Sequence, residues 1–66
     1  MTIKPKRIKI FKIRNRRGYA AVCMNNLTEG KTIFEAYDRM VKALRRSGIK
    51  ISAIPANLKT LVTTVG

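Results

Sequence analysis

The sequence predicts an α+β domain: an antiparallel sheet of three to five strands with one helix packed on one face. Two early segments rich in β-forming residues flank a glycine turn, and a later stretch repeats apolar residues at helical spacing. The residues after that stretch return to a strand-like pattern. This order, β-β-β-α-β, is typical of a two-layer arrangement. With 66 residues, the chain should form one small domain spanning 1–66.

Residues 1–6 are expected to be a flexible basic leader, because Pro5 restricts the backbone on both of its sides. A first strand is predicted over residues 7–14. Its apolar side chains switch from one face to the other between Ile10 and Phe11. The switch indicates either a β-bulge or a strand with apolar groups on both faces.

Residues 15–18 have the composition of a turn, since asparagine and glycine tolerate positive φ at little cost. A second strand is predicted over residues 19–24, so that the two strands form a hairpin with a strongly basic turn. The asparagines at 25 and 26 should break this strand. A short third strand over residues 27–31 would end at Gly30.

Thr32 and Glu35 have the spacing of a capping box, in which the threonine hydroxyl accepts from the backbone N–H three residues on. A helix is therefore predicted over Ile33–Ser47, with Gly48 as its stop. Its apolar stripe should face the sheet. The stripe consists of Ile33, Ala36, Tyr37, Met40, Val41 and Leu44.

Tyr37 lies on this stripe and is predicted to be core, whereas Phe34 beside it should pack at the start of the helix. Residues 49–54 alternate and predict another strand, which Pro55 would end. Residues 58–65 are rich in β-branched side chains and are expected to form a last strand.

The charge of the chain is its strongest functional feature. Fifteen Lys and Arg residues stand against three acids, giving a formal net charge of +12, and eight of the cations fall within the first 17 residues. Such an imbalance destabilises a compact state through repulsion. We therefore expect a polyanionic partner, with nucleic acid as the leading candidate and DNA or RNA undecided.

Two basic clusters are predicted to contact phosphates. Tyr19 follows the hairpin turn and is the one ring that could stack on a base, with ordinary packing on the sheet as the alternative. With so few aromatic residues, backbone-directed binding is the more natural expectation. The hairpin cluster consists of Lys9, Lys12, Arg14, Arg16 and Arg17. The helix-end cluster consists of Arg39, Lys42, Arg45, Arg46 and Lys50.

No residue pattern points to catalysis, a cofactor or a metal. The chain has no histidine, which excludes the usual zinc sites and histidine-based acid–base chemistry. Glu35 and Asp38 each precede a cation by four residues and are expected to form helix-surface pairs. The third acid, Glu29, has no partner carboxylate for acid–base work. We therefore predict a protein that is not an enzyme.

Cys23 is the only cysteine, which excludes an intrachain disulfide and favours a reducing, cytoplasmic setting. We expect its side chain to be a small buried hydrophobe. No apolar run is long enough to cross a membrane, so no membrane partner is expected.

A second class of function remains open. The chain could be an inhibitor or regulator module that docks on an acidic surface of a partner protein or nucleoprotein enzyme, as small phage or mobile-element regulators do. Dimerisation through an uncovered sheet edge is also compatible with so small a layer.

The stretch 17–44 resembles the HicB-like antitoxin module. The resemblance is carried by turn, cap and core positions: Gly18, Tyr19, Thr28, Gly30, Thr32, Glu35 and Ala36, with a looser match at Gly48 and Ile54-Pro55. It implies a truncated ribonuclease-H-like β-β-β-α-β layer without the catalytic carboxylates of nucleases. Antitoxins of this type append a DNA-binding segment, for which 66 residues leave no room, and they tend to be neutral or acidic. The resemblance therefore implies the fold and not the antitoxin activity.

Overall fold

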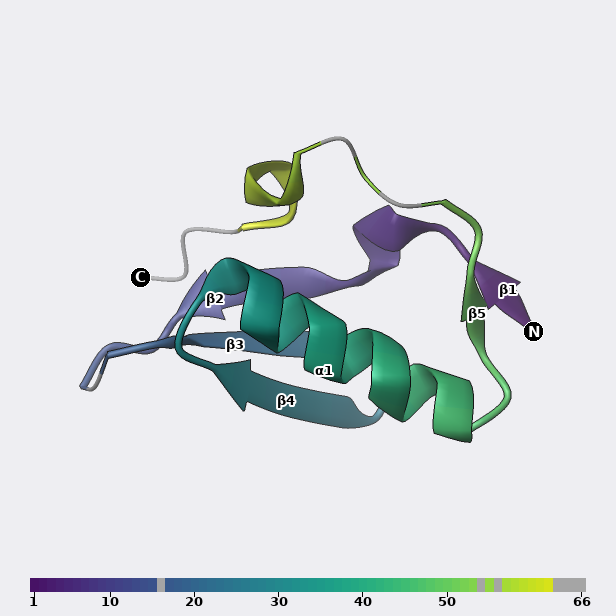
Figure 1. Cartoon of the computed structure of the whole chain (residues 1–66), viewed down its shortest axis with the longest axis horizontal. Helices are drawn as coiled ribbons and strands as arrows, with labels where there is room; N and C mark the ends of the chain where they lie inside the picture. Colours follow the sequence, from purple (N-terminus) through teal and green to yellow (C-terminus); the bar gives the residue numbers. More distant parts are fainter. Residues whose placement is uncertain (16, 54, 56, 63–66) are drawn as a thin grey trace.

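The computed structural model describes residues 1–15, 17–53, 55 and 57–62 and confirms the α+β fold class (Figure 1). Strands β2, β3 and β4 form an antiparallel sheet, and helix α1 packs on one of its faces. Two single turns of 3-10 helix, η1 and η2, complete the fold. The elements in chain order are β1 (Thr2–Ile3), η1 (Pro5–Arg7), β2 (Lys9–Lys12), β3 (Tyr19–Cys23), β4 (Asn26–Gly30), α1 (Ile33–Arg46), β5 (Lys50–Ile51) and η2 (Leu58–Leu61).

The register of the three-stranded sheet decides which residues face α1. Ile10, Ala21 and Thr28 lie side by side across the strands, and the Thr28 hydroxyl donates a 3.0 Å hydrogen bond to the Ala36 carbonyl of the helix. Successive residues of a strand point to opposite faces. The next row on the helix side is therefore Lys12, Tyr19 and Gly30. The other face of the sheet, which points away from α1, is called the open face. One of its rows is Lys9, Val22 and Leu27, and the next row is Phe11, Ala20 and Glu29.

The pairing of β2 with β3 is consecutive from Lys9 to Lys12, so this strand contains no bulge. Its apolar groups instead occupy both faces, which was the second of the two predicted arrangements. Ile10 is fully buried beneath α1, and Phe11 is half-buried on the open face.

The core lies between the sheet and the helix. Tyr37 and Cys23 are both buried there, as predicted. Burial raises the pKa of the Cys23 thiol, and the nearby positive charge of Arg7 opposes this effect. The largest side chains that lose essentially all contact with solvent are Ile8, Ile10, Cys23, Met40 and Leu44.

Both ends of α1 form as the sequence predicts. The Thr32 hydroxyl accepts a 3.0 Å hydrogen bond from the backbone N–H of Glu35. At the other end, Gly48 adopts φ +79° and donates its N–H to the Arg45 carbonyl at 3.0 Å. Ile49 donates to the Leu44 carbonyl at 2.9 Å, which completes a Schellman motif.

Gly30 allows α1 to approach β4 at backbone distance. A Cβ atom at this position would lie 2.5 Å from the Ala36 nitrogen and 2.8 Å from the Glu35 carbonyl carbon. Both neighbours belong to the helix and are fixed by its geometry. Glycine at position 30 therefore sets the spacing of the two layers in addition to ending the strand.

The first residues of the chain differ from the expected flexible leader. Thr2 and Ile3 form β1, which pairs in parallel with Lys50 and Ile51 of β5, and Ile3 is only 5% exposed. A single apolar residue in a two-residue strand has no periodicity, so the sequence pattern does not reveal it. Its burial in the core is the physical reason for the pairing.

The predicted strand over residues 58–65 is wrong in its described part, which forms η2. The Asn57 side chain accepts a 2.9 Å hydrogen bond from the Lys59 N–H, and Leu58 and Leu61, three positions apart, are both buried. This spacing suits a turn of helix better than a strand, in which the two side chains would point to opposite faces. Val62 makes one parallel bridge to Ile10.

The predicted strand over residues 49–54 is shorter in the structure, where β5 contains only Lys50–Ile51. Position 54 of that segment and positions 63–65 of the last predicted strand lie outside the described residues.

Candidate nucleic-acid interface

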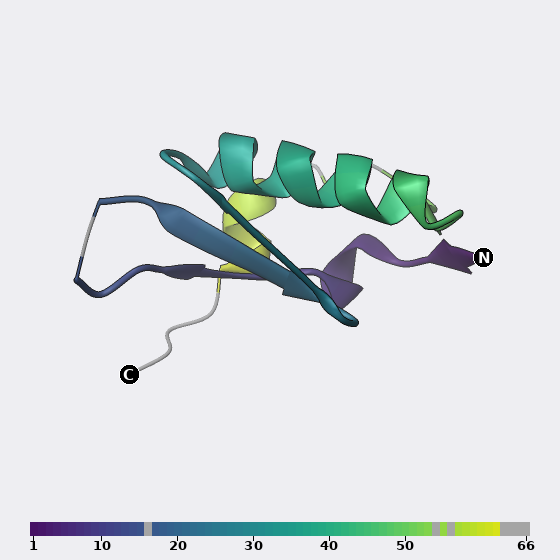
Figure 2. The ribbon, with the colours of Figure 1, turned by 90° about the horizontal axis from the view of Figure 1, so that it is seen from below.

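The β2–β3 hairpin projects past the start of α1 and carries the first basic cluster (Figure 2). Lys9 lies on the open face of the sheet and Lys12 on the helix face, so cations flank the hairpin on both sides. Arg14 and Arg17 lie in the turn, and both are exposed. Arg16, also predicted for this cluster, lies outside the described residues.

Gly18 fixes the geometry where the hairpin turn returns to β3. Its φ is +128°, and a Cβ atom there would lie 2.8 Å from the Gly30 carbonyl oxygen. Its own carbonyl accepts a 3.1 Å hydrogen bond from the Ile13 N–H, which closes the hairpin. The arginines of the turn therefore extend from a defined base.

Two predicted cations on the helix make contacts within the protein. Arg39 lies 2.9 Å from the Glu35 carboxylate and also donates to the Glu29 carbonyl at 2.8 Å. Lys42 lies 3.1 Å from the Asp38 carboxylate. Both predicted acid-first pairs are thus confirmed. As exposed pairs they contribute little to stability, but they neutralise two of the three acids of the chain.

The second cluster is larger than predicted. Arg45, Arg46 and Lys50 are exposed at the end of α1 and on β5. The β1–β5 pairing places β1 beside Lys50 and so brings Lys4, the next residue, to this end of the molecule, while η1, with Lys6 and Arg7, leads from there back toward β2. The sequence showed these cations only as part of the N-terminal run. We call the combined set the end cluster: Lys4, Lys6, Arg7, Arg45, Arg46 and Lys50.

The turn of the hairpin and the end of α1 with β5 lie at opposite ends of the molecule, whereas Lys9 of the hairpin cluster is only two residues from Arg7 of the end cluster. The hairpin turn is at one end of the longest axis, and the N-terminus, β1 and β5 are at the other (Figures 1 and 2). The molecule measures 34 × 22 × 18 Å. The structure therefore does not bring the predicted site residues into one patch. It separates them along an elongated body, with Arg39 and Lys42 between them on α1.

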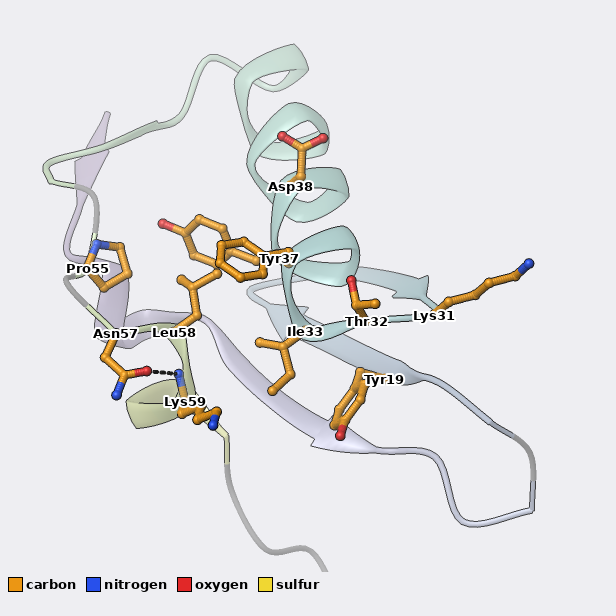
Figure 3. Close-up of a pocket in the computed structure, with 11 residues that line it drawn as sticks. Tyr19, Lys31, Thr32, Ile33, Tyr37, Asp38, Pro55, Asn57, Leu58 and Lys59 are labelled. Atoms are coloured by element: carbon orange, nitrogen blue, oxygen red, sulfur yellow. Dashed lines mark hydrogen bonds between the residues drawn. The ribbon is translucent and has the colours of Figure 1, made fainter.

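An apolar hollow opens beside the hairpin base, between the first turns of α1 and the segment that leads into η2 (Figure 3). Its volume is about 590 Å³. We call it the aromatic groove. Among the described residues, its apolar lining is formed by Tyr19, Ile33, Phe34, Tyr37, Pro55 and Leu58, and its polar lining includes Lys31, Asp38 and Lys59.

Phe34 does not pack at the start of the helix as predicted, because 75% of its surface is exposed. One residue along a helix is a turn of about 100°, so Phe34 points away from the stripe that starts at Ile33. Tyr37, one turn later, is buried to 9% exposure, and this burial raises the pKa of its hydroxyl. Tyr19 is half-buried at the far end of the groove.

Neither a metal-binding group nor a membrane-spanning helix occurs in the described part of the chain. Those residues include no group of three histidine, cysteine or acidic side chains that could hold a metal ion. Among the same residues, no helix combines the length and the apolar character that a membrane crossing requires.

Sequence comparison with protein-family models and characterised proteins, and structural comparison with solved structures, find no match to this chain. The resemblance to the HicB-like module therefore stays a prediction about the family. The edge-to-edge dimer also stays a prediction. The outer strands of the sheet are β2, which receives the Val62 bridge, and β4, where Arg39 contacts the Glu29 carbonyl.

Proposed function

We propose that this protein binds nucleic acid through phosphate contacts made by the hairpin cluster and the end cluster, and that it is not an enzyme. The observation that carries the proposal is the distribution of charge. Two of the three acids are paired with cations on α1, while Arg14 and Arg17 of the hairpin turn and Arg45, Arg46 and Lys50 at the end of α1 and on β5 are exposed. A polyanion would relieve the repulsion that this excess creates.

The shape of the molecule supports contact with a duplex. Its longest dimension is 34 Å, and one turn of a DNA helix also spans about 34 Å. Cations at both ends of such a body can reach phosphates roughly one turn apart on the same side of a duplex. Contacts of this kind position a protein on nucleic acid without reading its sequence.

The proposal is tested by fluorescence-anisotropy binding to duplex DNA, duplex RNA and single-stranded RNA at about 50 and 200 mM salt. Binding with a steep salt dependence is expected, and the preferred ligand would identify the nucleic acid. Replacing Arg14, Arg16 and Arg17 with alanine should weaken binding to all sequences and make the salt slope shallower by about one per lost contact.

A matched control is the double change Arg39→Ala and Lys42→Ala, since both cations already have carboxylate partners. It should affect binding less per charge removed than the hairpin change. Weak binding to all three ligands at low salt would overturn the proposal. Equal losses for the hairpin and control variants would leave only a general charge effect and remove the hairpin assignment.

A second candidate function is recognition of an acidic protein surface, and the open face of the sheet favours it. Leu27 is 63% exposed there, next in register to Val22 and Lys9. An apolar strip beside a cation suits a partner that is apolar and acidic. A complex of defined stoichiometry that survives nuclease treatment and is lost on Leu27→Lys would support it. Loss of the complex after nuclease would count against it.

A further inference from the structure

The aromatic groove presents a ring to solvent that the fold does not use. Phe34 is 75% exposed, although α1 has a buried stripe one residue away. Figure 3 shows Ile33, Tyr37 and Leu58 around the hollow, with Tyr19 beyond Ile33. Its volume of about 590 Å³ is within the range of roughly 300–1,000 Å³ that small-molecule sites occupy. The hollow is therefore large enough for a flat ring system.

The charges at the groove favour an anionic ligand. Lys31 and Lys59 both line it and are exposed. In Figure 3, the Lys31 side chain points away from the hollow, beyond Thr32, whereas Lys59 lies next to Leu58 on the wall formed by η2. Among the described lining residues the one acid is Asp38, whose carboxylate is held by Lys42 at 3.1 Å. An apolar floor with a cation on one wall is complementary to a ligand that joins a ring to a phosphate.

The groove also adjoins the hairpin cluster. Tyr19 lines one end of it and is paired in register with Lys12 on the helix face of the sheet. Side chains at directly paired positions lie close together. A strand of phosphates that follows Lys12 and the turn arginines would therefore pass the groove at Tyr19.

We propose that the aromatic groove takes the base of an unpaired nucleotide, stacked on Phe34, with its flanking phosphates contacted by Lys12 and Lys59. The inference rests on the proposed function and adds a preference for single-stranded over fully paired nucleic acid. Bases in a duplex are already stacked on one another, whereas unpaired bases stack on exposed aromatic rings. Such stacking tolerates any base, so sequence selectivity is not expected.

The experiment compares a thymidine oligonucleotide about ten nucleotides long with an abasic strand of the same length and charge. The wild-type protein should bind the thymidine strand roughly 5- to 150-fold more tightly, which is the range that one stacked base supplies. The chain has no tryptophan and only two tyrosines, both of which line the groove. Its intrinsic emission should therefore change with the thymidine strand and not with the abasic strand.

Phe34→Ala should remove this preference while leaving duplex binding unchanged. Since the ring is mostly exposed, the variant should fold, and its melting temperature checks this. The matched control is Leu27→Ala, a similarly exposed apolar residue on the open face of the sheet, which should behave like wild type in both assays.

Different results separate failure of this inference from failure of the proposed function. Equal binding of thymidine and abasic strands, or an equal loss of duplex and single-strand binding in Phe34→Ala, would overturn the groove assignment. Unchanged tyrosine emission despite a preference for bases would place the bases elsewhere and overturn it too. Absence of binding to every ligand at low salt would overturn the proposed function itself.

Discussion

Gly30→Ala should be among the most destabilising single-methyl changes in this protein. The added Cβ would lie 2.5 Å from the Ala36 nitrogen, while ordinary contact begins at 3.4 Å, so α1 must move away from β4 by about 1 Å. No flexible side chain can absorb this movement, because the nearest atoms belong to the helix backbone. The shift would also lengthen the hydrogen bond from Thr28 to the Ala36 carbonyl.

Overpacking a tight interior costs about 1–3 kcal/mol, and we expect the upper end here because both layers are rigid. The entropy of unfolding of a 66-residue domain is about 0.14 kcal/mol/K. A loss of about 3 kcal/mol should then lower the melting temperature by about 20 °C. Thermal unfolding followed by far-UV circular dichroism measures this directly.

Gly48→Ala is the matched control for Gly30→Ala. Gly48 has φ +79° but no atom within 4 Å of an added Cβ, so its substitution tests backbone conformation without steric contact. Its cost should be about 1 kcal/mol, or about 7 °C. If Gly30→Ala melts at the same temperature as Gly48→Ala, or above it, the close approach of α1 to β4 is wrong.

Further predictions concern the helix cap, a turn and the alkaline limit of stability. Thr32→Ala should lower the free energy of unfolding by about 1 kcal/mol, because the hydroxyl that accepts from Glu35 is lost; chemical denaturation with no change would place the helix start elsewhere. Met24→Asn should stabilise the protein by about 1 kcal/mol, since Met24 has φ 56° and asparagine tolerates this region; a lower denaturation midpoint would contradict it. Stability should fall as the pH rises above about 9 to 10, because burial raises the pKa values of Cys23 and Tyr37 above their unfolded values of 9.0 and 10.0. The folded state then holds protons that the unfolded state releases. Tyr37→Phe should flatten the upper part of this decline, and an unchanged pH profile would remove Tyr37 as its cause.

The helix and the central strands were predictable because their information is local. Thr32 and Gly48 mark the two ends of α1, and the apolar stripe between them has one period. The hairpin likewise follows from a turn between two strand-like segments. The segments near the ends of the chain were not predictable in this way, because β1 contains one buried residue and η2 buries only Leu58 and Leu61. The conformation of such short segments is determined by tertiary contacts with residues that are distant in the sequence.

The candidate site was predictable in its residue types and not in its arrangement. Counting charges identified Arg14 and Arg45 as members of basic clusters, but only the fold places the hairpin turn and the end of α1 at opposite ends of the molecule. The exposure of Phe34 was missed because a large apolar residue beside a stripe is normally packed. Helical spacing alone would have indicated it, since position 34 is rotated by about 100° from position 33.

The β1–β5 pair closes a long stretch of chain with few contacts. The hydrogen bond from the Met1 amino group to the Gly48 carbonyl joins residues 47 positions apart in the chain. Beyond it, the β1–β5 ladder consists of only two paired positions, Thr2 with Lys50 and Ile3 with Ile51. Contacts of this kind open locally at a lower free energy than the whole fold. We expect the amides of Lys50 and Ser52, which donate to carbonyls of Met1 and Ile3, to exchange with solvent before those of β3.

If the β1–β5 pair opened, the first seven residues would become a basic arm. The arm would carry Lys4, Lys6 and Arg7, and these cations would reach a larger region around the domain than they do in the closed form. An anionic strand that captures the arm would favour the open form, in the way that any ligand favours the state it binds. The protein would lose the burial of Ile3 and gain reach for its first encounter with a partner.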